Sequence, residues 1–243
     1  MKDGLFTIRE NNQIAPGVYK LIMSGDTSGI TKAGQFVDVQ IDGHFLRRPF
    51  SVCDWDAETV TVVYRKIGKG TEDLSRFRPG HVTDVLTGLG NGFDTAPAGD
   101  KPLLVAGGSG VPMMYALAKA LIAEGKAVTA VLGYRTAEDI FLADEIAALG
   151  ASVIITTEDG SAGVKGFVTD AMKTVDYTYF YTCGPEAMFE AIDKIAVTSG
   201  QFSFEARMGC GYGACMGCTC ETKYGHKRIC KDGPVLVREE IVW

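Results

Sequence analysis

Six short runs of apolar residues alternate with turn residues along the first hundred positions of the chain. They are rich in Val, Ile, Phe and Thr, and they cover residues 5–11, 17–23, 35–41, 49–54, 59–67 and 81–86. Their length and composition are typical of β-strands, and no long helical pattern lies between them. This part of the chain is therefore predicted to form an antiparallel β-barrel or a sandwich.

A different pattern begins at Lys101, where apolar strands alternate with stretches of helical periodicity. Between Pro112 and Gly125, for example, apolar residues recur at the spacing of one helix face. Strands are predicted at 102–106, 127–134, 152–157 and 178–182, and helices at 112–124, within 138–149, near 168–175 and at 185–199, with Gly150 and Gly200 as stops. This alternation predicts a doubly wound parallel sheet with helices on both faces.

These patterns divide the chain into three predicted parts. Residues 1–98 form the barrel, residues 99–200 form the α/β unit, and residues 201–243 form a small C-terminal unit that holds most of the cysteines. A chain of 243 residues is long enough for more than one domain. The predicted fold class is multidomain: an antiparallel β-barrel, a doubly wound α/β sheet and a small C-terminal domain.

The overall composition argues against several classes of protein. Apolar runs such as LLVA and VIITT are far shorter than the roughly 20 residues that span a membrane, so we expect no membrane helix. The N-terminal sequence MKDGLFTIREN lacks the apolar segment of a secretory signal, so we expect a cytoplasmic protein. The net charge of −6, with scattered Lys and Arg, argues against nucleic-acid binding.

Five of the seven cysteines lie between residues 210 and 230. Cys210, Cys215 and Cys218 form the pattern C-x4-C-x2-C, and Cys230 follows. This spacing is that of plant-type [2Fe–2S] centres, in which one tight loop supplies three thiolates and a distant cysteine supplies the fourth. Glycines at 209, 211, 213 and 217 allow the loop to fold closely around such a centre. We therefore predict these four cysteines as ligands and leave out Cys220.

A structural zinc site is the alternative interpretation of the same cysteines. Zinc ribbons usually contain two separated C-x2-C pairs, whereas this sequence has one, Cys215 with Cys218. The spacing favours iron–sulfur over zinc. The three histidines, His44, His81 and His226, form no metal-binding pattern and are expected to be surface or loop residues.

The segment LRRPFSVCD contains candidate residues for a flavin dinucleotide, namely Arg48, Pro49, Phe50 and Ser51. An Arg side chain can bind a pyrophosphate with two N–H groups, and a Ser hydroxyl can hydrogen-bond a flavin. Further along, IGKGTEDL offers a glycine turn and then Thr71 as the N-cap of a short helix, which suits an anion. Taken singly, such residues usually mark a solvated strand edge, but together they predict a phosphate cradle on the barrel.

A strand, a glycine loop and a helix follow one another in LLVAGGSGVPMMYAL. Backbone N–H groups at such a helix start suit a pyrophosphate, so the candidate contacts are Gly107, Gly108, Ser109 and Gly110. The dinucleotide fingerprint is incomplete, because Met113 stands at its third glycine, and Arg135 stands near the place of the ribose-binding acid. A plain tight turn is the alternative, and the choice between NAD and NADP stays open.

The segment Cys183-Gly184-Pro185 follows a predicted strand of the parallel sheet. A buried free cysteine is usually just a small apolar side chain. However, the carboxyl ends of strands in open α/β sheets are where ligands bind. We therefore take the three residues as candidate cofactor contacts, with Cys183 in the nicotinamide pocket, and we assign no catalytic residue.

In order, the segments RRPFS, IGKGT, GLGNGF, AGGSGVPMM, YTCGP and ARMGCGYGACMGCTC with CKDGPV resemble the ferredoxin reductase superfamily. The resemblance covers essentially the whole chain and is greatest to the electron-transfer subunits of dihydroorotate dehydrogenase B. It implies an FAD-binding barrel, an NAD-binding domain and a C-terminal [2Fe–2S] domain. Besides the RPFS segment, it implies FAD contacts at Val63, Tyr64, Arg65, Gly70 and Thr71. The chain departs from this family at Ser109, where relatives commonly have glycine, and in the short gap before Cys230.

The resemblance also implies a reaction and a partner. The reaction is the oxidation of (S)-dihydroorotate to orotate with NAD⁺ in pyrimidine biosynthesis. The chain would pass electrons from the FMN of a separate catalytic subunit through [2Fe–2S] and FAD to NAD⁺, with two copies of each chain in the complex. Related chains serve NAD(P)H-dependent ferredoxin reductases or sulfide dehydrogenases. A zinc-stabilised nucleotide-binding module without redox activity is the alternative from another class.

Overall fold

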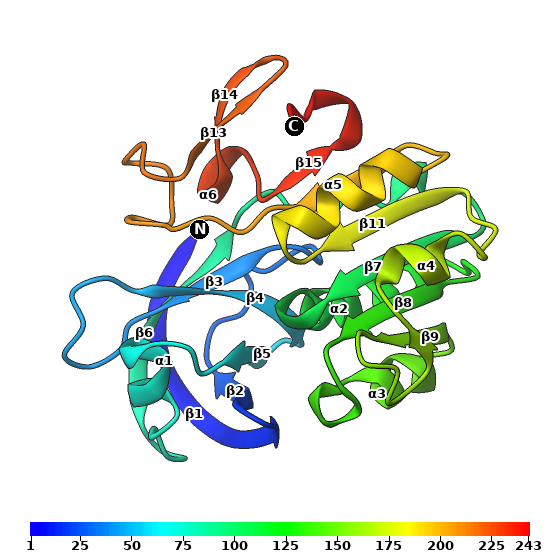
Figure 1. The fold of residues 1–243 in the computed structure, drawn as a ribbon. Coiled ribbons are helices and arrows are strands. Elements are labelled where there is room, and N and C mark those ends of the chain that lie inside the picture. The colour runs from blue at the N-terminus through cyan, green and yellow to red at the C-terminus, as the bar shows by residue number, and fades with distance from the viewer.

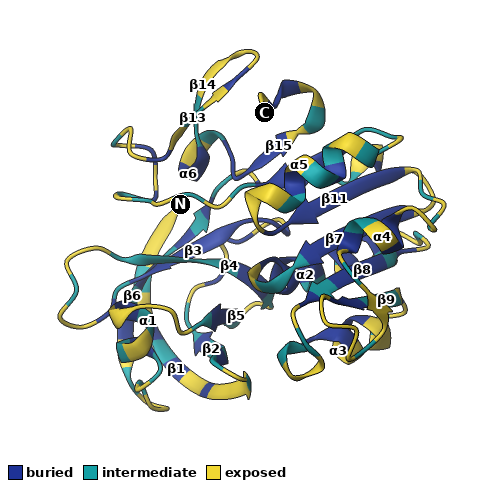
Figure 2. Ribbon diagram, viewed as in Figure 1, coloured by how far each residue is buried: buried dark blue, intermediate teal, exposed yellow.

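The structure is a computed structural model that describes the whole chain, Met1 to Trp243. Figure 1 shows three regions: a barrel that begins with the blue N-terminal strand, a green-to-yellow α/β unit beside it, and an orange-to-red C-terminal segment that lies against the α/β unit. In Figure 2, the central strands of the α/β unit are buried, whereas the tip of the C-terminal hairpin is exposed.

The six predicted strands of the first region all form, and they close into a barrel rather than a sandwich. They are β1 (Lys2–Ala15), β2 (Val18–Ser24), β3 (Phe36–Val39), β4 (Arg48–Trp55), β5 (Thr59–Arg65) and β6 (Val82–Leu89). The barrel order is β1-β2-β5-β4-β3-β6, and the short helix α1 (Lys69–Leu74) follows β5. Alternate side chains such as Leu21, Val37 and Val62 fill the interior, because successive strand residues point to opposite faces.

A seven-stranded sheet forms the centre of the second region. Its strands are β7 (Pro102–Gly107), β8 (Thr129–Tyr134), β9 (Ser152–Thr157), β10 (Val164–Lys165), β11 (Tyr179–Cys183), β12 (Gly200–Ser203) and β15 (Val235–Val237). The order is β10-β9-β8-β7-β11-β12-β15, and every pair is parallel except β12 with β15. The predicted parallel sheet is confirmed.

Helices cover both faces of this sheet. Helices α2 (Val111–Ala123) and α3 (Ala143–Ala148) pack with Leu104 and Ala106 on one face. On the other face, α4 (Val168–Met172) and α5 (Glu186–Ile195) pack with Leu103 and Val105. Single turns of 3₁₀ helix lie at Ala96–Ala98, Gly108–Gly110, Ala137–Asp139 and Arg238–Glu240. None of the helices combines the length and the apolar character needed to cross a membrane.

Three predicted helices are shorter than their apolar patterns indicated, and the one predicted near 168–175 ends at Met172. The pattern within 138–149 yields a helix only from Ala143, because Leu142 has a left-handed backbone with φ of 61°. The helix predicted at 185–199 ends at Ile195, because the backbone at Ala196 is already extended. Gly200 is not the stop of that helix, since it is the first residue of β12.

The C-terminal segment packs against the sheet and returns to it. It forms the hairpin of β13 (Thr219–Thr222) and β14 (Gly225–Arg228), the short helix α6 (Ile229–Asp232) and then β15. Cys218 and Cys230 belong to the same apolar cluster as Phe180, Phe189 and Phe202 of the α/β unit. The division predicted between residues 200 and 201 falls within strand β12.

Candidate functional site

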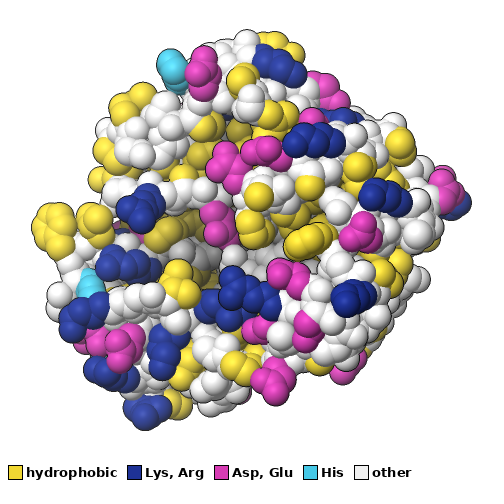
Figure 3. All heavy atoms as spheres, viewed as in Figure 1, with side chains coloured by type: hydrophobic (Ala, Val, Ile, Leu, Met, Phe, Trp, Pro, Cys, Tyr) yellow, Lys and Arg dark blue, Asp and Glu magenta, His cyan; other side chains and the backbone are white.

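A cavity of about 330 Å³ lies where the three regions meet. Its walls include eight of the nine residues predicted for FAD, namely Arg48, Pro49, Phe50, Ser51, Val63, Tyr64, Arg65 and Thr71. Ser109 from the glycine loop after β7 lines the same cavity, as do Phe204, Glu205, Ala206 and Met208 from the segment that leads to the cysteine loop. The structure thus brings residues from all three regions to one place. On the face of the molecule that Figure 3 shows, basic side chains gather over the barrel.

Two hydroxyl groups in this cavity have no hydrogen-bond partner in the protein. One belongs to Ser51, whose side chain makes no hydrogen bond. The other belongs to Ser203, whose residue is only 1% exposed and whose Oγ is buried without a partner. A buried polar group without a partner is costly, so the Ser203 hydroxyl suits a ligand that carries hydrogen-bonding groups, as a flavin does, and the half-buried Ser51 hydroxyl is free to bind the same ligand.

Aromatic rings form one wall of the cavity. The hydroxyl of Tyr64 donates a hydrogen bond to Asn11 Oδ1 at 2.9 Å, and burial raises the pKa of this phenol. Its ring stacks on Tyr19 with centroids 5.6 Å apart and contacts Phe50 at 5.5 Å. Because the hydroxyl is already used, Tyr64 offers the cavity an apolar ring rather than a polar group.

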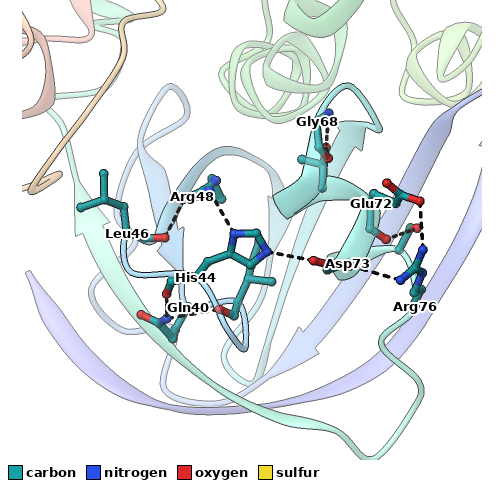
Figure 4. Close-up of polar contacts among 11 residues, drawn as sticks. Gln40, His44, Leu46, Arg48, Gly68, Glu72, Asp73 and Arg76 are labelled. Carbon is teal, nitrogen blue, oxygen red and sulfur yellow. Dashed lines mark hydrogen bonds and ion pairs between the residues drawn. The ribbon is translucent and has the colours of Figure 1, made fainter.

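Arg48 lies beside the start of helix α1. Its Nη1 donates to the carbonyl oxygens of Leu46 at 2.6 Å and Arg47 at 3.3 Å, as Figure 4 shows for the first of these. The ninth predicted FAD residue, Gly70, does not line the cavity but lies directly under this guanidinium. A Cβ at Gly70 would come within 2.8 Å of Arg48 Nε. A side chain at this position would therefore displace the guanidinium of Arg48 from its place against the helix.

The prediction that Thr71 is an N-cap is wrong. Helix α1 begins at Lys69 with Gly68 as its N-cap, so Thr71 is the third helical residue. Its Oγ1 accepts hydrogen bonds from the backbone N–H groups of Ile67 at 3.1 Å and Gly68 at 3.2 Å. Sequence spacing could not separate these two positions, because a threonine stabilises a helix start from either one.

Arg65 also faces the α/β unit. Its Nη2 lies 3.6 Å from Asp139 Oδ1, in the segment that precedes α3. In that segment Phe141 lines the cavity, and its carbonyl oxygen accepts a hydrogen bond from Tyr134 at 2.7 Å. The barrel and the α/β unit are thus joined at the edge of the cavity by an ion pair and a fixed turn.

The residues predicted for NAD come together at the carboxyl ends of β7 and β11. A Cβ at Gly110 would lie only 2.0 Å from the carbonyl oxygen of Cys183, and one at Gly184 would lie 3.2 Å from the nitrogen of Gly107. Gly107–Gly110 and Cys183–Pro185 therefore form one continuous backbone surface at the start of α2. Gly108 has a positive φ of 51°, and Arg135 is exposed directly after β8.

Cys183 is 1% exposed, and its burial raises the pKa of the thiol well above its usual range. A thiol in this environment stays protonated and is a poor nucleophile.

The four predicted ligand cysteines lie as two pairs. The N–H of Cys215 donates to Cys210 Sγ at 3.4 Å, and the N–H of Cys230 donates to Cys218 Sγ at 3.4 Å. Burial, then Cys218 and Cys210, raise the pKa of Cys230 to about 12, so the two pairs influence one another. No group of three or more His, Cys, Asp or Glu is arranged to hold a single metal ion. A [2Fe–2S] centre is held by four thiolates, and two neighbouring pairs suit its two irons.

The loop around Cys210 favours the thiolate. Partial burial raises the pKa of Cys210, but backbone N–H groups, from Cys215, Tyr212 and Ala214 in that order, outweigh burial and lower it to about 6. The thiolate is the form that binds iron. Cys220 lies on β13, opposite Lys227.

Two family models match the chain. The iron–sulfur cluster binding domain of dihydroorotate dehydrogenase B matches residues 205–242, and the oxidoreductase NAD-binding domain matches residues 104–194. Among similar proteins, the dihydroorotate dehydrogenase B (NAD(+)), electron transfer subunit of Geobacillus sp. (strain WCH70) is 42% identical over 100% of this chain and 99% of its own length. The subunit of the same name from Bacillus caldolyticus is 40% identical over 97% of both chains. The chain belongs to this family.

Solved structures share the fold of this dihydroorotate dehydrogenase B electron transfer subunit family member. The structure of an NADH-dependent reduced ferredoxin-NADP oxidoreductase has a TM-score of 0.89 and 30% identity, over 99% of this chain and 90% of that chain. A ferredoxin NADP⁺ reductase from Neisseria gonorrhoeae with bound FAD and NADP has the same fold, with a TM-score of 0.69 and 19% identity over 81% and 92% of the chains.

These findings confirm the reading of the sequence as a flavin and iron–sulfur oxidoreductase subunit of NAD-linked dihydroorotate dehydrogenase. The matched domains support the iron–sulfur centre and NAD, and the reductase fold supports FAD. The matched cluster domain does not support the zinc-stabilised module without redox activity.

Several residues that sequence reasoning missed hold the parts of this family member together. Asn91, in the GLGNGF segment, exchanges hydrogen bonds with Val235: Nδ2 donates to its carbonyl oxygen at 2.7 Å, and Oδ1 accepts from its N–H at 3.1 Å. Arg228 Nη1 donates to the carbonyl oxygen of Gly213 in the cysteine loop at 2.6 Å. The motif GLGNGF was visible in the sequence, but its partner was not, because Val235 lies far along the chain.

Glu205 was also missed, although it lies between the two halves of the site. It lines both the first cavity and a second cleft of about 580 Å³ between the start of α5 and the cysteine loop. Its Oε1 accepts a hydrogen bond from Ser109 Oγ at 3.3 Å. The surrounding protein raises the pKa of this carboxyl group. No sequence pattern marks this glutamate.

Proposed function

We propose that this chain accepts electrons from an FMN-bearing catalytic subunit that oxidises dihydroorotate, and delivers them to NAD⁺ by way of a [2Fe–2S] centre and FAD. The proposed complex contains two copies of each chain and acts in the cytoplasm. One observation carries the proposal: a single cavity is lined by the barrel segment Arg48–Ser51, by Ser109 of the loop after β7, and by the segment that enters the cysteine loop.

In this proposal, the barrel side of the cavity binds FAD. Arg48 provides N–H groups for the phosphates, and the hydroxyls of Ser51 and Ser203 offer partners to the flavin ring. Phe50 and Tyr64 exclude water from one side of the cavity. When bound, FAD supplies the exchange between single electrons and hydride that neither nicotinamide nor an iron–sulfur centre provides alone.

The two other cofactors are assigned to the adjoining loops. Cys210, Cys215, Cys218 and Cys230 are the proposed cluster ligands. Gly107–Gly110 and Cys183–Pro185 are the proposed NAD contacts, where backbone N–H groups at the start of α2 favour a pyrophosphate. Residues 1–98, 99–200 and 201–243 remain the proposed functional units.

Reconstitution with a partner tests the proposal. Mixing the purified chain with an FMN-bearing dihydroorotate-oxidising subunit should produce NADH when dihydroorotate and NAD⁺ are added, and omission of either chain should abolish it. A partner that oxidises dihydroorotate with an artificial acceptor, yet yields no NADH with this chain, would show that the proposal is wrong.

A second function is favoured by one finding. The solved NADH-dependent reduced ferredoxin-NADP oxidoreductase is 30% identical to this chain and nearly coextensive with it. An assay that supplies reduced ferredoxin instead of dihydroorotate and the catalytic subunit distinguishes the two functions. Formation of NADH or NADPH from ferredoxin alone would favour the reductase.

A further inference from the structure

His44 lies between a carboxylate and the arginine of the flavin cavity. Its Nε2 is 2.9 Å from Asp73 Oδ2, and its Nδ1 is 3.4 Å from Arg48 Nη2. Figure 4 shows the imidazole between these two groups, with Asp73 on helix α1 and Arg48 on the opposite side of the ring. The His44 side chain is only 12% exposed. The sequence predicted His44 as a surface or loop residue, and its contacts with Asp73 and Arg48 were not anticipated.

The chemistry of the two neighbours determines the tautomer of the imidazole. Arg48 is always a donor, so the Nδ1 that faces it must present a lone pair. Asp73 is an acceptor, and its hydrogen bond with His44 is the main reason that the pKa of this carboxyl group is lowered. The ring proton is therefore on Nε2 and points at Asp73. A carboxylate that fixes one nitrogen of a histidine so that the other faces a cation is the arrangement that orients histidine ligands in metal sites.

Both ends of this chain of contacts are fixed in the fold. On the loop side, the His44 N–H donates to the carbonyl oxygen of Ile41 at 3.0 Å, and Gln40 Nε2 donates to the His44 carbonyl oxygen at 2.7 Å. On the helix side, Arg76 Nη1 donates to Asp73 Oδ1 at 3.3 Å. The imidazole therefore has little freedom to move away from Arg48.

The contacts of Arg48 leave part of its guanidinium available. Nη1 is used by the carbonyl oxygens of Leu46 and Arg47, and one Nη2–H is directed to His44. The remaining N–H groups have no protein partner, and Arg48 lines the cavity. An arginine whose geometry is fixed before binding loses less side-chain freedom when it binds a phosphate.

We propose that His44, held by Asp73, is a positioning residue that orients Arg48 for the phosphates of FAD. This inference rests on the proposed assignment of the cavity to FAD. The competing view is that the His44–Asp73 pair only fastens the loop between β3 and β4 to helix α1. The two views differ in one respect: positioning of Arg48 affects flavins that carry phosphates, whereas fastening of the loop affects every flavin.

The test uses the full-length chain after removal of FAD, with the dissociation constants of FAD and riboflavin measured by flavin fluorescence. Riboflavin is the control ligand because it has the ring but no phosphate. His44→Leu should raise the FAD constant about five- to tenfold and leave the riboflavin constant within about twofold of the wild type. His44→Asn places an amide oxygen near the position of Nδ1 and should restore part of the FAD affinity.

A matched control is present on the same barrel. His81 Nε2 lies 3.5 Å from Asp42 Oδ2, so this second histidine also lies beside a carboxylate of the loop between β3 and β4, but it makes no hydrogen bond with Arg48. His81→Leu should leave both constants unchanged. If His44→Leu does not fold, Asp73→Ala removes the carboxylate that orients the imidazole. This variant should likewise weaken FAD binding and leave riboflavin binding unchanged.

A double-mutant cycle separates failure of this inference from failure of the flavin assignment. Arg48→Met should weaken FAD but not riboflavin, and His44→Leu should then cause no further loss in the Arg48→Met background. If Arg48→Met does not weaken FAD selectively, the flavin assignment is wrong. If it does, but His44→Leu has no effect, affects riboflavin equally or adds fully to Arg48→Met, the positioning role is overturned and the proposed function stands.

Discussion

Asp38 is a buried carboxyl group whose removal should stabilise the protein. It lies on β3 under the cysteine loop, where it is 2% exposed and its Oδ1 has no hydrogen-bond partner. A Cβ at Gly211, which has a φ of +75°, would come within 2.4 Å of Asp38 Oδ2. Burial raises the pKa of Asp38 to about 6, although Arg47 and Arg48 act in the opposite direction. The substitution Asp38→Asn keeps the shape and removes the charge.

The magnitude follows from the shift in pKa. An Asp in the unfolded chain has a pKa near 4, so the pKa of Asp38 is about two units higher in the folded state. This difference corresponds to a destabilisation of about 3 kcal/mol when the buried group is ionised. Below about pH 4 the group is neutral in both states and costs nothing. As the pH rises through about 6, the buried group ionises and the full cost appears. Asp38→Asn should therefore stabilise the protein by up to about 3 kcal/mol at pH 8, and by about half of that at pH 5.

The assay is thermal unfolding followed by circular dichroism at both pH values. At about 2–4 °C per kcal/mol for a chain of this size, the midpoint of Asp38→Asn should rise by roughly 6–12 °C at pH 8 and by about half as much at pH 5. Asp100→Asn is the control, because Asp100 is exposed and its carboxylate makes no hydrogen bond. A variant that is less stable at both pH values, or that gains equally at both, would refute the reasoning.

Four further substitutions test the site. Cys220→Ser should keep the visible spectrum and the iron content of the protein, whereas Cys218→Ser should lose most of both; equal loss would show that the ligand set is wrong. Gly110→Ala should lower stability by about 3 kcal/mol or more, because its Cβ would meet the carbonyl oxygen of Cys183, and an unchanged denaturation midpoint would contradict this. Asn91→Ala should cost about 1–3 kcal/mol in chemical denaturation by leaving the Val235 backbone unpaired, and a neutral result would mean that water replaces the side chain.

The parts of the fold that the sequence predicted are those specified by local patterns. The six barrel strands are visible because one face of each is buried and alternate residues are apolar. The spacing of Cys210, Cys215 and Cys218 is a local property of one loop, so it identified a cluster site before any fold was known. The segments around Arg48 and Ser109 were found for the same reason, and the structure brings both to one cavity.

The parts that sequence reasoning missed depend on contacts between distant segments. Strand β15 has only three residues and is stabilised by pairing with β12, so no local pattern marks it. The left-handed backbone at Leu142 interrupts an apolar pattern that reads as helical throughout. The role of His44 depends on Asp73, which lies on another element, 29 residues further along the chain.

The most direct test of the central claim follows electrons through this chain in the reconstituted complex. With FAD removed from this chain, dihydroorotate should still generate the electron paramagnetic resonance signal of a reduced [2Fe–2S] centre, but no NADH should form from NAD⁺. Addition of FAD should then start NADH formation. Absence of the cluster signal, or formation of NADH without FAD, would contradict the account.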